Sequence, residues 1–243
     1  MTQNIYDDPG FFAAYGRLER SLTGLDGAPE WPALQALLPD VSGARVLDLG
    51  CGFGWFGRWA RTHGAASVLG IDVSERMLSR ATADTHDPAI RYMRSDLETV
   101  VLPHASFELA YSSLALHYLV DLNRLLAQVH TALVAGGHFI ASVEHPIYTA
   151  PSVPRWSVDA AGRRVWPIDR YSVEGSRTTN WLAPGVVKQH RTIGTYVNLL
   201  LDAGFRLTRL VEWAPTDAQI AARADLLDER ARPMFLLFAA VRV

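Results

Sequence analysis

The chain has 243 residues but a single cysteine, Cys51, which excludes an internal disulfide framework and a metal site built from cysteines. Its histidines show neither an HExxH motif nor a comparable ligand spacing, so we expect no metal. The net charge is −2, from 23 cationic and 25 anionic side chains. This balance lacks the basic footprint of a chain that binds nucleic acid, and we expect no such partner.

Long apolar runs are also missing. The longest, residues 235–241, is far shorter than the roughly 20 residues of a membrane span. The first ten residues carry neither the basic nor the apolar segment of a secretory signal. Since 49% of the residues are apolar and 20% are charged, the chain has enough apolar side chains for a full core. We expect a folded, cytoplasmic protein that does not enter membranes.

Strand and helix patterns alternate over the first two thirds of the chain. Strands are expected at 45–50, 67–72, 90–96, 107–113 and 138–145, and helices at 9–21, 29–38, 55–64, 74–84 and 121–137, with Ser74 and Asp121 as N-caps. A helix at 192–205, a strand at 206–213, a charged helix at 216–232 and a strand at 234–243 follow. This alternation predicts an open parallel sheet with helices on both faces and ligands at the carboxyl ends of its strands.

Residues 146–190 interrupt that alternation and are too many for an ordinary connection. They carry Trp156, Trp166, Tyr171 and Trp181, and residues 151–191 hold seven Arg or Lys against three Asp or Glu. We interpret this stretch as a lid suited to a planar or anionic small molecule; a surface hairpin or a dimer contact is the alternative. The predicted organisation is a helical cap (1–42), a core (43–145 and 191–243) and a lid insertion (146–190).

The strongest motif is VLDLGCGFGWFG, where a strand ends in glycines 50, 52 and 54 before a helix. Glycines there let a ligand approach the backbone closely. Gly52, Gly54 and Gly57 also spell the GxGxxG of dinucleotide sites, with Asp72 twenty residues after Gly52. The competing ligand is S-adenosylmethionine, which carries a sulfonium and an ammonium instead of a pyrophosphate.

Asp48 favours the second ligand. Its carboxylate at the strand end would repel a pyrophosphate and attract a cationic amino-acid group. Asp72 and Asp96 end the next two strands, where they can accept hydrogen bonds from ribose hydroxyls and from an adenine amino group. Met77 and Leu97 are placed to sandwich the adenine ring. Helix N-capping by the aspartates and core packing by Met77 and Leu97 are the alternatives.

With these residues the chain resembles the class I S-adenosylmethionine-dependent methyltransferases, in particular their bacterial small-molecule (type 11-like) branch. The matching stretches within residues 43–146 are VLDLGCGFG, GIDVSERML, RSDLE, FELAYSSLALHYL and LVAGGHFIASVEHPI. The resemblance implies a Rossmann-like, seven-stranded, mostly parallel sheet whose last, antiparallel strand is residues 234–243. The lid insertion would follow strand five.

The resemblance also implies roles for single residues. Asp48, Gly50, Gly52 and Gly54 would shape the methionine end of the site, beside the small Cys51. Asp72 would hold the ribose, Asp96 and Leu97 would flank the adenine, and Ser112 would lie near the methionine amino group. Tyr15 and Arg20, from an N-terminal helix, would reach the carboxylate; a core tyrosine and a surface arginine are the alternatives.

Methyl transfer is a direct displacement that leaves S-adenosylhomocysteine and needs a base only when the acceptor must lose a proton. We rank His145, then His117, then His190 as the base or acceptor-orienting group, because all three are predicted at the ligand-binding rim. Glu144 and His145 should point to opposite faces. An NAD(P)-dependent oxidoreductase and a non-catalytic cofactor-binding module are the alternatives. The acceptor is expected to be a small molecule; its identity and the oligomeric state are not encoded in these motifs.

Overall fold

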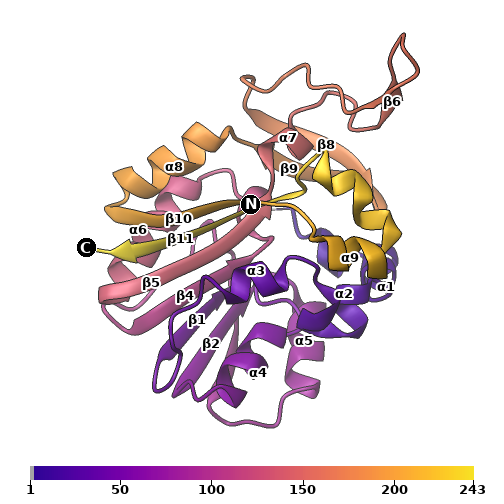
Figure 1. Ribbon diagram of the computed structural model, residues 1–243. Coiled ribbons are helices and arrows are strands. Elements are labelled where there is room, and N and C mark those ends of the chain that lie inside the picture. The colour runs from indigo at the N-terminus through magenta and orange to yellow at the C-terminus, as the bar shows by residue number, and fades with distance from the viewer. Residues whose placement is uncertain (1–2) are drawn as a thin grey trace.

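The computed structural model describes residues 3–243, so the first two residues of the predicted 1–42 cap lie outside the described residues. Within that range, seven strands form one sheet in the order β10–β11–β5–β4–β1–β2–β3 (Figure 1). Strands β1 to β5 are parallel, and β11 runs antiparallel to both β5 and β10. The predicted fold class, including the antiparallel last strand, is confirmed. The bounds are β1 Arg45–Leu49, β2 Ser67–Asp72, β3 Ile90–Arg94, β4 Phe107–Ser113, β5 Leu133–Glu144, β10 Phe205–Trp213 and β11 Phe235–Arg242.

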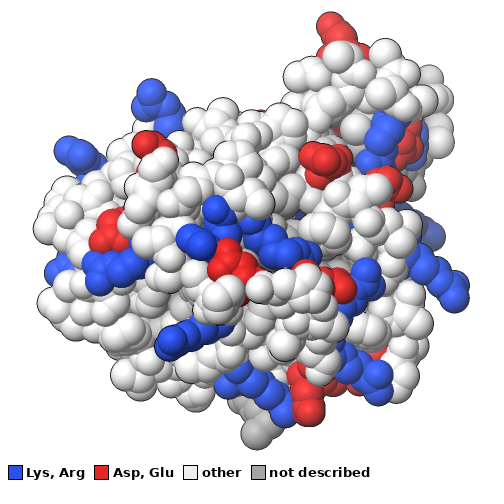
Figure 2. Space-filling view, turned by 90° about the horizontal axis from the view of Figure 1, so that it is seen from below, with Lys and Arg blue, Asp and Glu red and all other residues white. Residues whose placement is uncertain are grey.

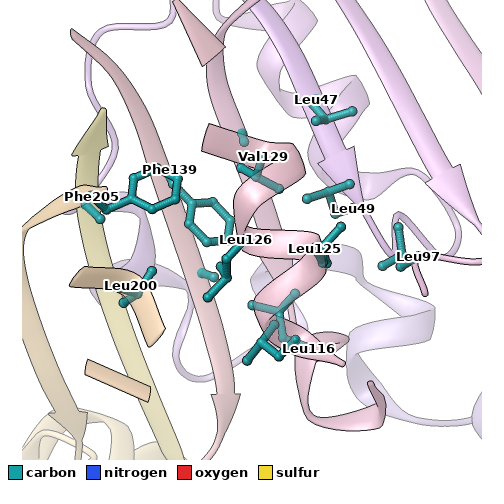
Figure 3. Packing of buried hydrophobic residues seen from close by; sticks show 14 of the residues in the cluster. Leu47, Leu49, Leu97, Leu116, Leu125, Leu126, Val129, Phe139, Leu200 and Phe205 are labelled. Carbon is teal, nitrogen blue, oxygen red and sulfur yellow. The ribbon is translucent and has the colours of Figure 1, made fainter. Parts of the chain in front are cut away.

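Helices cover both faces of this sheet, as expected. Side chains alternate along β1, so that Leu47 and Leu49 point to one face and Val46 to the other. The first face packs against α6 (Leu122–Ala132) and α8 (Ile193–Asp202), and Figure 3 shows Leu125 and Leu126 of α6 within this cluster. The second face packs against α3 (Trp31–Gln35) and α4 (Trp55–Thr62), while α5 (Glu75–Ala83) lies beside β2 and β3.

Capping residues begin two helices where the sequence predicts it. Ser74 accepts a hydrogen bond from the backbone of Met77 at the start of α5, and Asp121 accepts one from Arg124 at the start of α6. The end of α6 differs from expectation. The helix stops at Ala132, and the glycines expected to close it lie inside β5, beside a register shift in its pairing with β4. The glycines thus mark an irregular strand rather than a helix end.

Two other expected helices are interrupted. The helix predicted at 9–21 divides into α1 (Pro9–Tyr15) and α2 (Glu19–Leu22), because Leu18 between them is extended. The charged helix predicted at 216–232 divides into α9 (Asp217–Ala222) and the 3-10 helix η4 (Ala224–Arg230), because Arg223 is extended. Local propensity is a weak guide where tertiary contacts decide the backbone.

The insertion, residues 146–190, has its own secondary structure. It begins with the short helix α7 (Pro146–Thr149) and continues with two antiparallel hairpins. The first is formed by β6 (Ser157–Val158) and β7 (Arg164–Val165), and the second by β8 (Gly175–Trp181) and β9 (Ala183–His190). In Figure 1 the first hairpin extends away from the sheet, whereas the second lies close to the carboxyl ends of its strands.

The surface mixes charges of both signs. On the face shown in Figure 2, cationic and anionic side chains alternate instead of gathering by sign. Ion pairs such as Arg45–Glu108 and Arg61–Asp87 join exposed or half-exposed side chains. No helix in residues 3–243 has the length and apolar character that a membrane crossing requires.

Candidate active site

A cavity of about 390 Å³ lies at the carboxyl ends of the parallel strands. Its wall includes Gly50 and Gly52 after β1, Asp72 at the end of β2, Ser113 at the end of β4 and Glu144 at the end of β5. These positions are distant in sequence, and the parallel sheet brings them to one edge. The cavity is therefore where the predicted fold should bind its ligand.

The glycine loop forms the floor of this cavity. Gly50, Gly52 and Gly54 have φ values of +74°, +52° and +72°, a region that other residues rarely adopt. A Cβ on Gly50 would collide with Ala115, whereas a Cβ on Gly52 would have no atom within 4 Å. Gly50 is thus required by packing, and Gly52 leaves the backbone open to the cavity.

Asp72 is fixed by the loop that it faces. One carboxylate oxygen accepts a hydrogen bond from the Gly52 N–H at 2.9 Å, and the other accepts one from the Ser74 N–H at 2.9 Å. Burial raises the pKa of Asp72 in spite of these bonds. Each oxygen keeps a second lone pair. The side chain is therefore oriented and still able to accept hydrogen bonds from a diol.

Asp48 lines a smaller cavity of about 100 Å³, which shares Gly50, Gly52 and Ser113 with the larger one. Its side chain is 2% exposed. Burial, and then the charge of Asp72, raise the pKa of Asp48 to about 8. A carboxyl group in this environment gains most from an incoming cation.

The lining of the smaller cavity also holds unsatisfied polar atoms. The hydroxyl of Ser21 and the indole N–H of Trp55 are buried and have no hydrogen-bond partner among the described residues. Buried polar atoms are normally paired. Together with Asp48, they fit a ligand whose end is polar and positively charged, such as the amino-acid end of S-adenosylmethionine.

Most of the remaining residues that were expected to bind the cofactor line one of these two cavities. Asp96, Met77 and Leu97 line the larger cavity, and the two apolar side chains are 1% and 6% exposed. Cys51 lines the smaller cavity, and burial and then Asp48 raise the pKa of its thiol well above the ordinary value. A protonated thiol is a poor nucleophile, so Cys51 is a small packing residue.

The N-terminal cap contributes Tyr15 and Arg20 to the walls of both cavities. Arg20 donates two hydrogen bonds, at 2.8 and 3.0 Å, to the carboxylate of Glu30, which is 1% exposed. The arginine is therefore an oriented, paired cation instead of the solvated surface residue of the alternative interpretation.

The structure does not place Ser112 as the sequence suggested. Its hydroxyl donates to the carbonyl of Leu49 at 2.8 Å, inside the sheet, and its side chain is fully buried. The next residue, Ser113, lines both cavities. Successive side chains of a strand point to opposite faces, so a shift of one residue exchanges their positions.

Part of the lining of the larger cavity is aromatic. Tyr118 follows β4, Tyr148 lies in α7, and Trp181 ends β8. The ring of Trp181 meets the ring of Phe11 with centroids 5.6 Å apart. The insertion and the N-terminal cap are therefore in contact above the cavity. Further aromatic lining residues are Tyr6, Trp213 and Phe235.

Of the three candidate histidines, only His117 lines this cavity. Its Nδ1 accepts a hydrogen bond from the Glu144 N–H at 3.3 Å. Burial, and then the charges of Lys188 and Arg191, hold its pKa well below 6.5. The imidazole is thus neutral, and because Nδ1 accepts, Nε2 carries the proton. In this tautomer His117 is a hydrogen-bond donor and not a base.

His145 and His190 are fully buried and outside the cavity lining. Nδ1 of His145 caps α7 by accepting from the Ile147 N–H, and Nε2 contacts Glu212 at 2.9 Å. The ring nitrogens of His190 contact the Thr149 hydroxyl and the Tyr171 carbonyl. Both rings have all their polar atoms engaged in structural contacts, so the expected position at the ligand rim does not match the structure.

The aromatic residues of the insertion differ in whether they line the cavity. Trp181 lines the cavity, but Trp156 and Trp166 pack around the guanidinium of Arg232, whose Cζ lies 5.5 and 4.4 Å from their ring centroids. The basic side chains counted between 151 and 191 are all outside the lining. Sequence gives the number of charges in a loop but not the direction in which they point.

Lining residues that were not singled out from sequence include Ser113, Tyr148, Trp213 and Glu229. Behind Glu144 lies Lys188, with which it forms an ion pair. Lys188 is the single lysine in the chain, since the other cationic side chains are arginines. That compositional oddity is the one sequence signal that could have drawn attention to it.

In the described part of the chain, no group of three His, Cys, Asp or Glu is placed to hold a metal ion.

Comparison with known proteins decides between the ligands that this geometry allows. The family described as "Methyltransferase domain" matches residues 47–141. An S-adenosylmethionine-dependent methyltransferase of Mesorhizobium loti is 61% identical in sequence, and its crystal structure superposes with a TM-score of 0.88 over 90% of this chain and 100% of that chain. The chain belongs to the S-adenosylmethionine-dependent methyltransferases. It is therefore an enzyme, and its cofactor is S-adenosylmethionine.

Other relatives of this methyltransferase differ in how much they match. An uncharacterized protein of Haemophilus influenzae is 32% identical over 99% of this chain and 97% of its own length. A malonyl-[acyl-carrier protein] O-methyltransferase of Pectobacterium atrosepticum is 38% identical, but over 43% of this chain and 40% of its own length. The match to this second relative thus covers less than half of either chain.

Proposed function

We propose that this methyltransferase transfers the methyl group to a small-molecule acceptor bound at the aromatic end of the larger cavity. The proposal rests on the observation that the expected cofactor residues and the aromatic residues line the same cavity. One cavity of about 390 Å³ is lined both by Gly52 and Asp72 and by Tyr118, Trp181 and Glu144. A donor and an acceptor that share one cavity can be aligned without a metal or a second site.

The cofactor end is proposed to work by polar complementarity. The carboxylate of Asp48 and the pair of Arg20 with Glu30 would hold the amino-acid group, with Tyr15 beside them. Asp72 would accept from the ribose hydroxyls, and Asp96 from the adenine, packed between Met77 and Leu97. S-adenosylmethionine supplies an already activated methyl group on its sulfonium.

The acceptor end is proposed to contribute orientation and exclusion of water. Holding two reactants in line can supply about 7 to 11 kcal/mol of the barrier in favourable cases. The Tyr118 hydroxyl is fixed by a 3.1 Å hydrogen bond to Tyr6, and neutral His117 can donate through Nε2. The Glu144 carboxylate lines the same cavity and is proposed to help orient the acceptor.

The insertion and the N-terminal cap are proposed to close over this cavity together, as a lid and a cap. The Gln3 side chain donates to the Gly185 carbonyl at 2.8 Å and accepts from the Val187 N–H at 2.9 Å. With the contact of Phe11 and Trp181, these bonds tie the two segments to each other. Closure of this kind excludes water and completes a binding site.

Two measurements test the proposed function. Isothermal titration calorimetry should detect binding of S-adenosylhomocysteine and no binding of NADH, which separates the transferase from an oxidoreductase with the same glycine loop. Incubation with methyl-labelled S-adenosylmethionine and a metabolite extract should then yield a labelled small molecule by mass spectrometry. Cofactor binding without any labelled product would instead support a non-catalytic module.

A further inference from the structure

Two carboxylates line the cavity, the buried Glu229 and the largely shielded Glu144, and each is paired with a cation. Glu144 is paired with Lys188, and Glu229 is paired with Arg232. Both carboxylates belong to the cavity lining and neither cation does. Each pair is neutral as a whole, but its negative end is the one presented to the cavity.

Lys188 is held in this position from several sides. It is 3% exposed, and its ammonium lies 4.8 Å from the ring centroid of Trp181 and 5.9 Å from that of Tyr118. Cation–π contacts of this kind, together with the ion pair, hold the ammonium beside Glu144. The orientation of the pair is thus built into the packing of the insertion against β5.

Glu229 adds an independent sign of a missing ligand. The residue is 4% exposed, and one of its carboxylate oxygens accepts from Arg232. The other oxygen, Oε2, is buried and has no hydrogen-bond partner among the described residues. A buried carboxylate oxygen without a donor is unfavourable. A donor group brought by a ligand in the cavity would satisfy it.

Tyr148 shows that the two carboxylates act on the same space. Its phenol also lines the cavity, and burial, and then the negative charges of Glu144 and Glu229, raise its pKa to about 12 in spite of the nearby Arg232. The aromatic ring and the two carboxylates therefore surround one volume. The guanidinium of Arg232 already lies over this ring, 4.6 Å from its centroid, so the two carboxylates are the groups here that a cationic nitrogen group prefers.

The cations that do line the cavity lie elsewhere. Arg20 is bound to Glu30 at the cofactor end. Arg223 is bound to Asp225, and their side chains are 43% and 65% exposed, so this pair lies at the solvent side. Neither arginine is available to neutralise an acid held between Glu144 and Glu229, and a carboxylate placed there would meet like charge.

We propose that the acceptor carries a positively charged nitrogen group, an ammonium or amidinium, bound by Glu144 and Glu229 next to Tyr148. The inference rests on the proposed function and concerns the group that is recognised, not the atom that is methylated. It replaces the anionic alternative of the planar or anionic acceptor expected from the composition of the insertion, because none of those basic side chains lines the cavity.

Fractionation of the metabolite extract by charge tests this inference. The extract is separated by ion exchange at pH 7 into cationic, neutral and anionic pools, and each pool is incubated with the enzyme and methyl-labelled S-adenosylmethionine. We expect labelled product from the cationic pool. Product from the anionic or neutral pool alone would overturn the charge assignment and leave the transferase proposal standing. No product from any pool would overturn both.

Variants then connect the result to the two carboxylates. With the acceptor from the active pool, Glu144→Gln and Glu229→Gln should each lower kcat/KM at least tenfold, mainly through KM, and Glu144→Asp should lower it less. Glu75→Gln, whose side chain is 70% exposed on α5, serves as the matched control. Affinity for S-adenosylhomocysteine should stay within twofold in every variant, which shows that the cofactor end is intact. Unchanged KM in both glutamine variants would contradict the assignment.

Discussion

The ammonium of Lys188 and the carboxylate of Glu144 form an ion pair between β9 of the insertion and β5 of the core. Their side chains are 4% and 15% exposed, so the pair is largely shielded from water. Loss of one partner leaves the other charge buried and uncompensated. The pair is therefore a contact through which the insertion, the sheet and the acceptor end of the cavity depend on one another.

Removal of Lys188 should destabilise the protein more than removal of the whole pair. Lys188→Met should lower the free energy of unfolding by about 3 to 5 kcal/mol, because Glu144 stays buried without its cation. The double variant Lys188→Met, Glu144→Leu should recover much of that loss, since apolar replacement of a buried pair is often neutral. Urea denaturation of the two single variants and the double variant measures the coupling. Additive losses would show that the pair does not act as a unit.

Cofactor binding should release a proton from Asp48. At pH 6.5 a carboxyl group with a pKa of about 8 is protonated, and the free α-ammonium of the ligand is charged. Placing the ammonium beside Asp48 favours the carboxylate, so about one proton should leave. Titration calorimetry with S-adenosylhomocysteine in buffers of different ionisation enthalpy counts the protons.

Asp48→Asn provides the control for that count. The variant should release no proton at pH 6.5 and should bind about tenfold or more weakly, because a hydrogen bond to a charged group is lost. Asp84→Asn, on the surface of the molecule, should behave like wild type in both respects. Buffer-independent heats in the wild-type protein would contradict an ammonium site at Asp48.

The two loop glycines should respond differently to alanine. Gly50→Ala should reduce stability by more than the roughly 1 to 2 kcal/mol of left-handed strain, since its Cβ would also collide with Ala115. Gly52→Ala adds a methyl group to open space in the cavity, so it should weaken cofactor binding more than Gly50→Ala does. Thermal melts with and without S-adenosylhomocysteine separate the effects. Equal ligand-induced shifts in both variants would show that Gly52 does not face the cofactor.

Burial of neutral His117 should make the protein acid-sensitive. Its folded pKa lies below 6.5, so below that pH the unfolded chain binds a proton that the folded protein does not. Stability contributed in this way is complete above pH 6.5 and is lost as the pH falls, at up to about 1.4 kcal/mol per pH unit. His117→Gln should flatten the acid limb of stability against pH, whereas exposed His86→Gln should not. Chemical denaturation between pH 5 and 7.5 provides the test.

The cofactor end of the site was largely predictable from sequence. A strand, a glycine turn and a helix follow each other directly in the chain, so the position of Asp48, Gly52 and Asp72 depends on short-range geometry and on the register of adjacent parallel strands. Ser112 shows the limit of that reasoning. A shift of one residue along β4 was enough to place Ser113 in the cavity instead.

The acceptor end depends on long-range packing that no local pattern contains. Lys188 meets Glu144 across 44 residues, and Glu229 lies in η4, after the extended Arg223 that interrupts the expected helix 216–232. Composition alone favoured a planar or anionic acceptor, since the basic residues of the insertion were counted without their directions. The chemical character of this end follows from which end of each ion pair faces the cavity, and that is a property of the folded chain.

A crystal structure with S-adenosylhomocysteine would show whether the cofactor and the acceptor occupy different parts of one cavity. The predicted result is a ligand along the glycine loop, with its amino-acid group beside Asp48 and its ribose beside Asp72, and with the space between Glu144, Tyr148 and Trp181 left for the acceptor. A ligand that fills the Glu144 end, or that leaves Asp48 and Asp72 without contacts, would contradict the account.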